Sequence, residues 1–305
     1  MRTANDYYRD RFGGKVYRVS LNGGMSCPNR DGTLDTRGCI FCSRDGSGDF
    51  AASAALSVTE QLAAAKQKVA AKLPKKQHNF AGYMAYFQAF TNTYAPVPYL
   101  KSIFEEALSD PEVVGISIAT RPDCLPADCI ALLAELNAKK PVFVELGLQT
   151  VHEATAQFIR RGYSLAVYDD AAARLQAVGI PVITHVILGL PKESVPDMAA
   201  TVQHVVKAKV HGIKLQLLHV LEDTDLAEYY RSAPPTEFAC MSPEGYLEAL
   251  CAVLRFIPED VVIYRLTGDG PKRTLIAPLW SADKKNVLNT LHRYLERSSL
   301  CDPKC

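Results

Sequence analysis

The sequence predicts an α/β protein built as a partial (β/α)6 barrel of the TIM-like type. From residue 15 to residue 221, apolar runs rich in β-branched residues alternate with helical patterns. The runs are continuously apolar, which indicates strands buried on both faces, as in a parallel sheet. An open doubly wound sheet is the alternative, but no GxGxxG follows the first predicted strand. A barrel therefore explains the pattern better.

The predicted strands and helices follow one another along this stretch, with two helices after the fourth strand. The strands cover residues 15–21, 78–90, 113–120, 141–149, 181–189 and 211–221. The helices cover residues 57–73, 98–110, 126–139, 151–161, 164–179 and 194–209. The first helix begins with Ser57 and Glu60 at the spacing of a capping box, and Gly179 ends the fifth.

Residues 222–305 are predicted to form a C-terminal α/β extension. We expect a loop or short helix at 223–238, a helix at 242–256, a strand at 260–266 and a helix at 281–298. No Ser/Gly-rich linker separates this segment from the core barrel at 1–221. The extension is therefore predicted to pack on the barrel and not to form an independent domain.

The composition is that of an ordinary globular protein. Hydrophobic residues make up 48% and charged residues 22% of the 305 residues, and the formal net charge is +1. Such a small net charge gives no sign of a nucleic-acid or membrane partner. No run approaches the roughly 18 apolar residues of a membrane span, and residues 1–15 lack the apolar core of a secretory signal. The protein is expected in the cytoplasm, with no membrane partner.

Three of the nine cysteines lie close together after the first predicted strand. Cys27, Cys39 and Cys42 follow a C-x11-C-x2-C spacing, which suits three corners of an iron–sulfur cluster with one iron left open. A structural zinc site needs a fourth ligand, and the nearest histidine, His78, lies on another predicted element. A redox-active pair or a set of unrelated buried thiols would also be compatible with this spacing. The remaining cysteines are predicted to be inert thiols: Cys124, Cys129, Cys240, Cys251, Cys301 and Cys305.

Four further segments extend the pattern in the same order along the chain. They are ATRPDCLP (119–126), VELGLQT (144–150), RRGYS (160–164) and THVILGLPKES (184–194). With the cysteine loop they resemble the radical S-adenosylmethionine (SAM) superfamily, in its elongator-catalytic-subunit-like branch and the YhcC-like bacterial subgroup of that branch. The commonest superfamily spacing is C-x3-C-x2-C, so the longer first gap predicts a loop that bulges before Cys39.

The resemblance implies a radical SAM enzyme with a 4Fe-4S cluster on Cys27, Cys39 and Cys42. The open iron would chelate the methionine part of SAM, and reductive cleavage would give a 5′-deoxyadenosyl radical. The cofactor carries this chemistry while the protein orients it. By resemblance, SAM contacts are expected from residues near the strand ends: Phe41, Gln88, Thr120, Arg121, Gln149, Arg161, Gly189 and Leu190.

Each of these residues has an expected role. Arg161 would face the SAM carboxylate, since a guanidinium fork suits that group; a surface arginine is the alternative. Gln149 would bind a ribose hydroxyl or the carboxylate, and Gln88 would meet the amino group. Thr120 and Arg121 end the third strand, and Arg121 either contacts SAM or braces the barrel through Asp123.

The remaining expectations concern adenine and the lumen. Phe41 would flank adenine or shield the cluster. Gly189 and Leu190 would let adenine lie against the backbone. His185 and His219 are predicted to be core histidines with hydrogen-bond partners, and the alternative is that they face the substrate in the barrel lumen.

The resemblance leaves the substrate open between RNA and a small molecule. Elongator-like relatives act on the wobble uridine of tRNA, so tRNA modification is a candidate. An electron donor such as flavodoxin or ferredoxin is implied. The alternative function is a zinc-dependent structural or RNA-binding module without redox chemistry.

Overall fold

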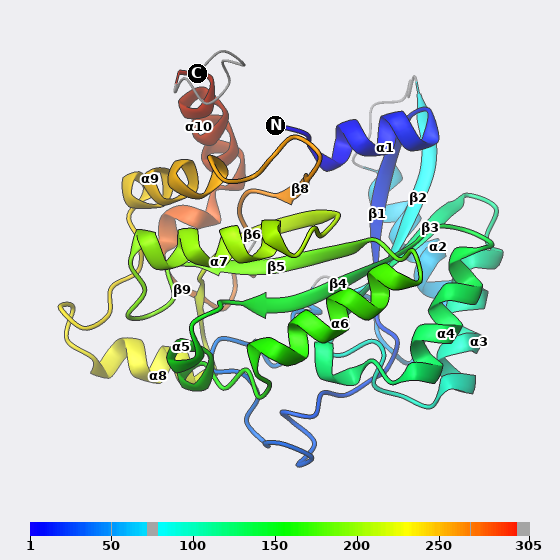
Figure 1. Cartoon of the computed structure of the whole chain (residues 1–305), viewed down its shortest axis with the longest axis horizontal. Coiled ribbons are helices and arrows are strands. Elements are labelled where there is room, and N and C mark those ends of the chain that lie inside the picture. The colour runs from blue at the N-terminus through cyan, green and yellow to red at the C-terminus, as the bar shows by residue number, and fades with distance from the viewer. Residues whose placement is uncertain (50, 72–78, 269, 298–305) are drawn as a thin grey trace.

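Seven parallel strands form one curled sheet in the computed structural model, which describes residues 1–49, 51–71, 79–268 and 270–297 (Figure 1). Their order is β1-β2-β3-β4-β5-β6-β8. They are β1 (Lys15–Leu21), β2 (Phe80–Phe87), β3 (Val113–Thr120), β4 (Val142–Gln149), β5 (Val182–Leu188), β6 (Gly212–Leu217) and β8 (Val262–Arg265). The predicted partial barrel is confirmed, and one strand more than predicted joins its sheet.

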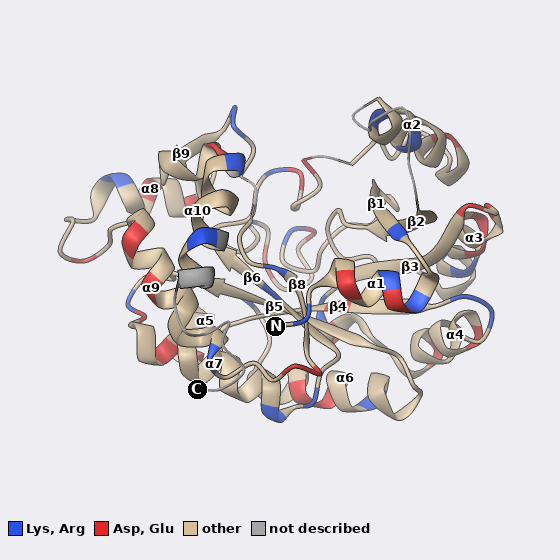
Figure 2. Cartoon of the chain, turned by 90° about the horizontal axis from the view of Figure 1, so that it is seen from above, with Lys and Arg blue, Asp and Glu red and all other residues tan. Residues whose placement is uncertain are grey.

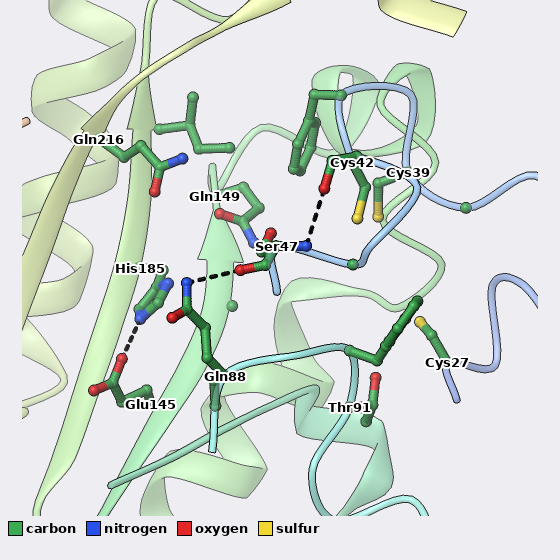
Figure 3. A pocket seen from close by; sticks show the side chains of 18 of the residues that line it. Cys27, Cys39, Cys42, Ser47, Gln88, Thr91, Glu145, Gln149, His185 and Gln216 are labelled. Atoms are coloured by element: carbon green, nitrogen blue, oxygen red, sulfur yellow. Dashed lines mark hydrogen bonds and ion pairs between the residues drawn. The ribbon is translucent and has the colours of Figure 1, made fainter. Parts of the chain in front are cut away.

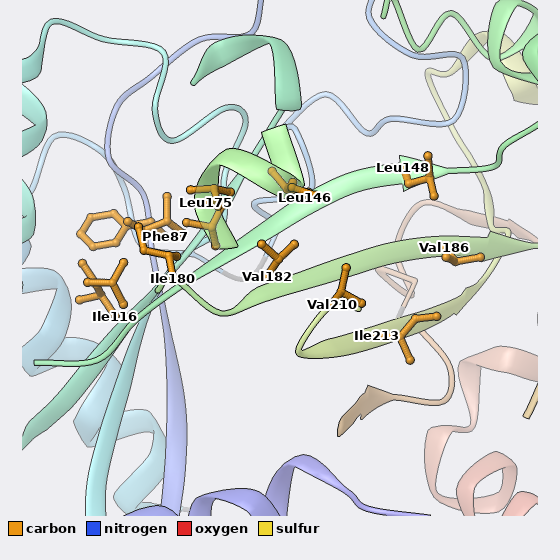
Figure 4. Packing of buried hydrophobic residues seen from close by; sticks show 14 of the residues in the cluster. Phe87, Ile116, Leu146, Leu148, Leu175, Ile180, Val182, Val186, Val210 and Ile213 are labelled. Carbon is orange, nitrogen blue, oxygen red and sulfur yellow. The ribbon is translucent and has the colours of Figure 1, made fainter. Parts of the chain in front are cut away.

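Helices cover the outer face of this sheet (Figure 2). They are α2 (Val58–Ala70), α3 (Val97–Ser109), α4 (Ala127–Asn137), α6 (Leu165–Ala177) and α7 (Val195–Lys207). Outward side chains such as Phe87, Ile116, Leu146 and Val182 are fully buried beneath them, and Leu175 of α6 packs on the same layer (Figure 4). Burying each such side chain contributes about 1.5–3 kcal/mol, so this layer is the main hydrophobic core.

Local sequence signals set the ends of several helices. The capping box of Ser57 and Glu60 is present at α2, and Ser194 forms the same motif with Asp197 at α7. Gly179 follows α6 with a φ of 74°, a conformation that suits glycine. The helix predicted over 151–161 is shorter, because α5 spans only Glu153–Phe158.

An N-terminal helix that was not predicted from the sequence closes one end of the barrel. This helix, α1 (Ala4–Phe12), begins with a capping box of Thr3 and Asp6, the signal from which it was predictable. Its Tyr8 packs on the side chains that fill the lumen there: Met84, Phe143 and Ile183. The carbonyl oxygen of Arg2 accepts a hydrogen bond of 2.9 Å from the backbone N–H of Ile263. The start of the chain is thus fastened to β8.

The predicted strand over 211–221 is divided into two. After β6, the backbone N–H of Leu218 donates to Leu188 (3.0 Å), and the chain then leaves the sheet. Val220–Leu221 forms β7, which pairs antiparallel with β9 (Leu275–Ala277). Periodicity alone did not predict this separation, because both pieces are apolar and buried.

The C-terminal segment supplies the seventh strand of the main sheet. The strand predicted at 260–266 is confirmed as β8, which pairs in parallel with β6. The same segment forms α8 (Asp225–Ser232), which contacts β7, α9 (Pro243–Leu254), which contacts α7 and β5, and α10 (Lys284–Arg297), which contacts α9. Three residues that were singled out in the sequence lie outside the described residues: His78, Cys301 and Cys305. None of the described helices combines the length and the apolarity needed to cross a membrane.

Candidate functional site

A cavity of about 520 Å³ opens at the carboxyl ends of the strands, beside the cysteine loop (Figure 3). Ligand pockets typically measure about 300–1,000 Å³. The cavity is lined by most of the predicted site residues: Cys27, Cys39, Phe41, Cys42, Gln88, Thr120, Arg121, Gln149 and Arg161. The fold therefore brings together side chains from separate strands and loops.

Gly189 and Leu190 are not part of this lining. Leu190 is 2% exposed and packs in an apolar cluster with Ile40 and Ile159. Gly189 has a φ of 86°, and an added Cβ there would meet Met241 at 3.0 Å. The apolar wall of the cavity comes instead from Ile187, two residues before Gly189, and from Leu218.

Asn29 fastens the cysteine loop to the opposite side of the site. It is 1% exposed, and its Nδ2 donates to the carbonyl oxygen of Arg160 at 2.7 Å. The same Nδ2 lies 3.5 Å from Cys39 Sγ, within the range of a hydrogen bond to sulfur. The backbone N–H of Gly38 donates to the carbonyl oxygen of Asn29 at 2.7 Å. The long gap between Cys27 and Cys39 is thus closed at its base by Asn29.

Arg30 holds the second half of the loop. Its Nη2 donates to the carbonyl oxygens of Cys42 (2.9 Å) and Ser43 (2.7 Å). Gly38 has a φ of 77° and lies so close to this guanidinium that an added Cβ would stand 2.9 Å from Nε. The predicted bulge is therefore a fold-back that carries its own support for the cysteines.

Burial favours the neutral thiol form of Cys39 and Cys42. Burial and the neighbouring Cys42 raise the pKa of Cys39 to about 12, and burial also raises the pKa of Cys42. Because metals bind the thiolate form, ligation would displace protons here. Thiolate donors suit iron–sulfur clusters and zinc. Within residues 1–49, 51–71, 79–268 and 270–297, no three His, Cys, Asp or Glu side chains are grouped as ligands of a single metal ion.

Arg161 is a buried arginine whose donors are all engaged. It is 1% exposed, and Nε donates to the carbonyl oxygen of Tyr163 at 2.9 Å. Nη1 donates to the carbonyl oxygens of Leu148 (3.2 Å) and Thr150 (2.6 Å). Nη2 faces both carboxylate oxygens of Glu153, at 3.3 and 3.4 Å. A SAM carboxylate would have to share these donors with the protein.

Arg121 pairs with Asp123, which is the bracing contact that was one of its two expected roles. Its Nε and Nη2 donate to the two carboxylate oxygens of Asp123, at 2.9 and 2.7 Å. Its Nη1 donates to the carbonyl oxygen of Arg161 at 3.0 Å. The Thr120 hydroxyl lies 2.6 Å from that of Thr93. Both residues line the cavity with their polar groups already paired to protein.

The side-chain amides of Gln88 and Gln149 differ in their hydrogen bonding. The side chain of Gln88 donates to the carbonyl oxygen of Ser47 (2.7 Å) and accepts from the Ser20 hydroxyl (2.9 Å; Figure 3). Gln149 ends β4 with a φ of 67°, which turns its side chain into the cavity. Among the described residues, no side-chain hydrogen bond of Gln149 is formed. Its amide is therefore available to a ligand.

A buried charged layer lies deeper in the lumen. Glu145 of β4 is 1% exposed and accepts from Ser117 (2.5 Å) and from His185 Nε2 (2.7 Å). It also pairs with Arg18 of β1 at 3.0 Å and with Lys214 of β6. This network joins five strands of the sheet.

The charges in this layer shift one another's pKa values. Burial opposes ionisation of Glu145, yet Arg18, Lys214 and the hydrogen bond from His185 hold the pKa of its carboxyl well below the usual value. Burial and the charge of Arg18 lower the pKa of Lys214. Burial and Lys214 lower the pKa of His185 to about 4. Glu145 is therefore the ionised centre of the network.

Sequence reasoning missed Arg18, Glu145 and Arg265 as lining residues. A signal existed, because a charged residue inside an apolar strand points to the lumen or to a partner. Glu145 and Gln149 also share one face of β4 by the two-residue period of a strand. His185 and His219 each have a hydrogen-bond partner, as expected, and both line the cavity.

Known families match nearly the whole chain. The family model described as the radical SAM superfamily matches residues 36–205. A second one, described as a radical SAM C-terminal domain, matches residues 210–297.

Two curated relatives match over most of their length. The uncharacterized protein YtqA of Bacillus subtilis is 44% identical over 96% of this chain and 89% of its own. Protein YhcC of Escherichia coli is 35% identical over 93% of this chain and 89% of its own. A more distant relative is named a tRNA uridine(34) acetyltransferase, from Methanocaldococcus jannaschii. It is 24% identical over 61% of this chain, which spans only 34% of that protein.

Solved structures share the fold. An archaeal Elp3 from Methanocaldococcus infernus superposes with a TM-score of 0.67 at 18% identity. The match covers 93% of this chain and 63% of that one, so this chain spans less than two thirds of it.

Proposed function

Because this chain belongs to the radical SAM superfamily of enzymes, as its motifs predicted, we propose that Cys27, Cys39 and Cys42 hold a 4Fe-4S cluster. We propose further that the cavity beside them binds SAM. The observation that supports this most directly is that all three thiols line one cavity at the carboxyl ends of a partial barrel. A cluster held by these cysteines would supply one electron, received from an electron donor, to the sulfonium group of SAM; cleavage of a C–S bond would give methionine and a 5′-deoxyadenosyl radical able to abstract hydrogen from substrate.

The protein's own residues would orient the cofactor. The free amide of Gln149 is the group best placed to bond SAM. Arg161 donates to the carbonyl oxygens of Leu148 and Thr150, on either side of Gln149. It would therefore act as a positioning residue that holds Gln149 in its unusual backbone conformation. Phe41, on the wall beside the cysteines, would cover an adenine or the cluster.

We propose the partners of the reaction as classes of molecule. The family's chemistry requires a substrate and an electron donor, and a small cytoplasmic carrier such as flavodoxin or ferredoxin fits the second role. We propose the cytoplasm as the location, because thiols stay reduced there. For the substrate, the elongator-like resemblance and the name of the Methanocaldococcus jannaschii relative support tRNA modification, and a small molecule is the other candidate.

The test is anaerobic reconstitution of the protein with iron and sulfide. Wild-type protein should bind both, show the broad visible absorption of a thiolate-bound cluster, and yield 5′-deoxyadenosine from SAM and dithionite. Cys39→Ala should lose the cluster and the cleavage. Cys240→Ala, outside the cavity lining, is the control and should keep both.

Two results would count against the proposal. One is Cys39→Ala protein that still carries the cluster and cleaves SAM. The other is protein purified without oxygen that holds one zinc and neither iron nor sulfide, which would favour the zinc-dependent alternative.

A further inference from the structure

The deep part of the cavity carries more positive than negative charge. Arg18 of β1 and Arg265 of β8 line it from the two edge strands of the sheet. Lys214 of β6 lies behind them and is the direct cross-strand neighbour of Arg265. Of the described residues in this layer, only Glu145 is a carboxylate. Arginine stays protonated in proteins, so Arg18 and Arg265 place two positive charges beside this one carboxylate, and the arrangement calls for a second anion.

Glu145 cannot serve as that anion for Arg265. A carboxylate offers about four acceptor positions. One oxygen of Glu145 takes Ser117 (2.5 Å) and Arg18 (3.0 Å), and the other takes His185 (2.7 Å) and Lys214. Its acceptor capacity is therefore used.

Arg18 and Lys214 each form an ion pair with Glu145, whereas Arg265 forms no ion pair with a carboxylate of the described residues. Its guanidinium is half-buried, and within the described part of the chain its one hydrogen bond runs from Nη1 to Gln216 Oε1, at 3.5 Å. A cation without a counter-charge is unfavourable when its side chain is half-buried. A guanidinium fork is well shaped for a carboxylate or phosphate group.

We propose that Arg265 and Arg18, with the amide of Gln216, bind an anionic group of a small-molecule substrate. The role as a substrate site rests on the proposed function, whereas anion binding does not depend on turnover. Figure 3 shows His185 and Glu145 at one side of the cavity and the cysteines at the other, with Gln88 and Gln149 between them. A substrate anchored by its anionic end would thus extend toward the cysteine loop and present a C–H bond there.

This charge layer favours a small anion over an RNA base. A nucleotide that enters a pocket from RNA leads with its base and leaves its phosphates at the mouth. A neutral uracil ring would then meet the arginines deep in the lumen, and their charge would stay unpaired. A free carboxylate or phosphate compound satisfies them directly.

The experiment is a binding titration on reconstituted protein with SAM and without reductant. Inorganic phosphate and malonate are titrated separately by calorimetry at constant ionic strength, with chloride as the background anion. Wild-type protein should bind at least one of them saturably, and the tighter probe tells a phosphate from a carboxylate substrate. R265Q should weaken that binding by at least about tenfold, and R265K by less.

R231Q is the matched control. Arg231 is exposed and pairs with Glu222 outside the cavity, so this variant should bind as wild type does. Equal binding by R265Q and wild type, or no saturable binding of either probe, would overturn the proposal. An unmodified tRNA transcript whose binding depends on Arg265 would overturn it too. After the titration, dithionite is added to the wild-type samples and SAM cleavage is measured. Anion binding without SAM cleavage would show that the proposed function fails while the anion site stands.

Discussion

At the scale of single residues, Asn29 shows how the unusual cysteine spacing is accommodated. One buried amide bonds the backbone at Arg160 and faces the sulfur of Cys39. Hydrogen bonds to the sulfurs of a cluster make its reduced state easier to reach. The segment between Cys27 and Cys39 thus anchors the cysteine loop through Asn29 and places a hydrogen-bond donor beside the sulfur of Cys39.

Replacing Asn29 should therefore change the redox potential of the proposed 4Fe-4S cluster. In Asn29→Ala, loss of an N–H···S bond worth about 1 kcal/mol should lower the midpoint potential by on the order of 40 mV. A redox titration followed by electron paramagnetic resonance measures it. Asn286→Ala, on the exposed face of α10, is the control. An Asn29→Ala cluster with the wild-type potential would show that the amide does not act on the sulfur.

The sequence predicted the site unevenly at this scale. Cys27, Cys39 and Cys42 are close in the chain, so local spacing was enough to single them out. Arg18 and Arg265 are far apart in the sequence, and only the folded sheet, with β1 and β8 at its two edges, brings both side chains to one cavity. Gly189 was expected to let adenine lie against its backbone, and it lies outside the cavity lining, beside Met241. Such placements depend on tertiary contacts that no local pattern contains.

At the scale of elements, α1 and its surroundings form an apolar floor to the barrel. His211, just before β6, lies in this floor. Its ring is 4.6 Å from that of Tyr7, and its Nε2 lies 2.9 Å from the Tyr264 hydroxyl. Burial, with a smaller effect of the charge of Arg2, lowers the pKa of His211 to about 4. The imidazole is therefore neutral in the folded protein at mildly acidic pH.

This floor should make the stability of the protein pH-dependent. The unfolded chain protonates His211 near the ordinary histidine value of about 6.5, while the folded protein resists protonation down to about pH 4. Acid therefore favours the unfolded state, and the free energy of unfolding should fall by about 1.4 kcal/mol per pH unit across that window from this residue alone. We expect the free energy of unfolding of metal-free protein, measured with urea, to fall between pH 6.5 and pH 5. In His211→Phe this fall should be smaller than in wild type by on the order of 2 kcal/mol. An unchanged pH dependence would contradict this role.

The elements themselves were largely predictable. Each predicted strand up to 181–189 has its counterpart in the sheet, because the apolar runs are long and bounded by helix signals. The separation of β7 from β6 was not predicted, since it is caused by pairing with the distant β9. The helix α1 was missed although its capping box was visible in the sequence.

At the scale of the whole molecule, the C-terminal segment completes the sheet. Gly212 and Ile213 of β6 pair with Val262 and Ile263 of β8, and α9 contacts α7. Residues after 221 also contribute Arg265 to the cavity. The prediction that residues 222–305 are not an independent domain can be tested directly.

Neither part should fold alone. A chain of residues 1–221 would leave the edge of β6 unpaired and part of the apolar surface of α7 exposed, which favours aggregation. We expect no cooperative thermal transition by circular dichroism for this fragment or for 222–305, and a single transition for the full chain. A cooperative transition in either fragment would show that the segment is a domain of its own.

The hydrogen bond between Arg2 and Ile263 joins the start of the chain to β8, and this has a consequence for biosynthesis. A ribosome delivers Arg2 at the start and Ile263 only when most of the polypeptide has been made. Until then, the edge of β6 that pairs with β8 stays open on the nascent chain, and contacts of such long sequence separation form slowly. The contact between the start of the chain and β8 can therefore form only after most of the chain has been translated.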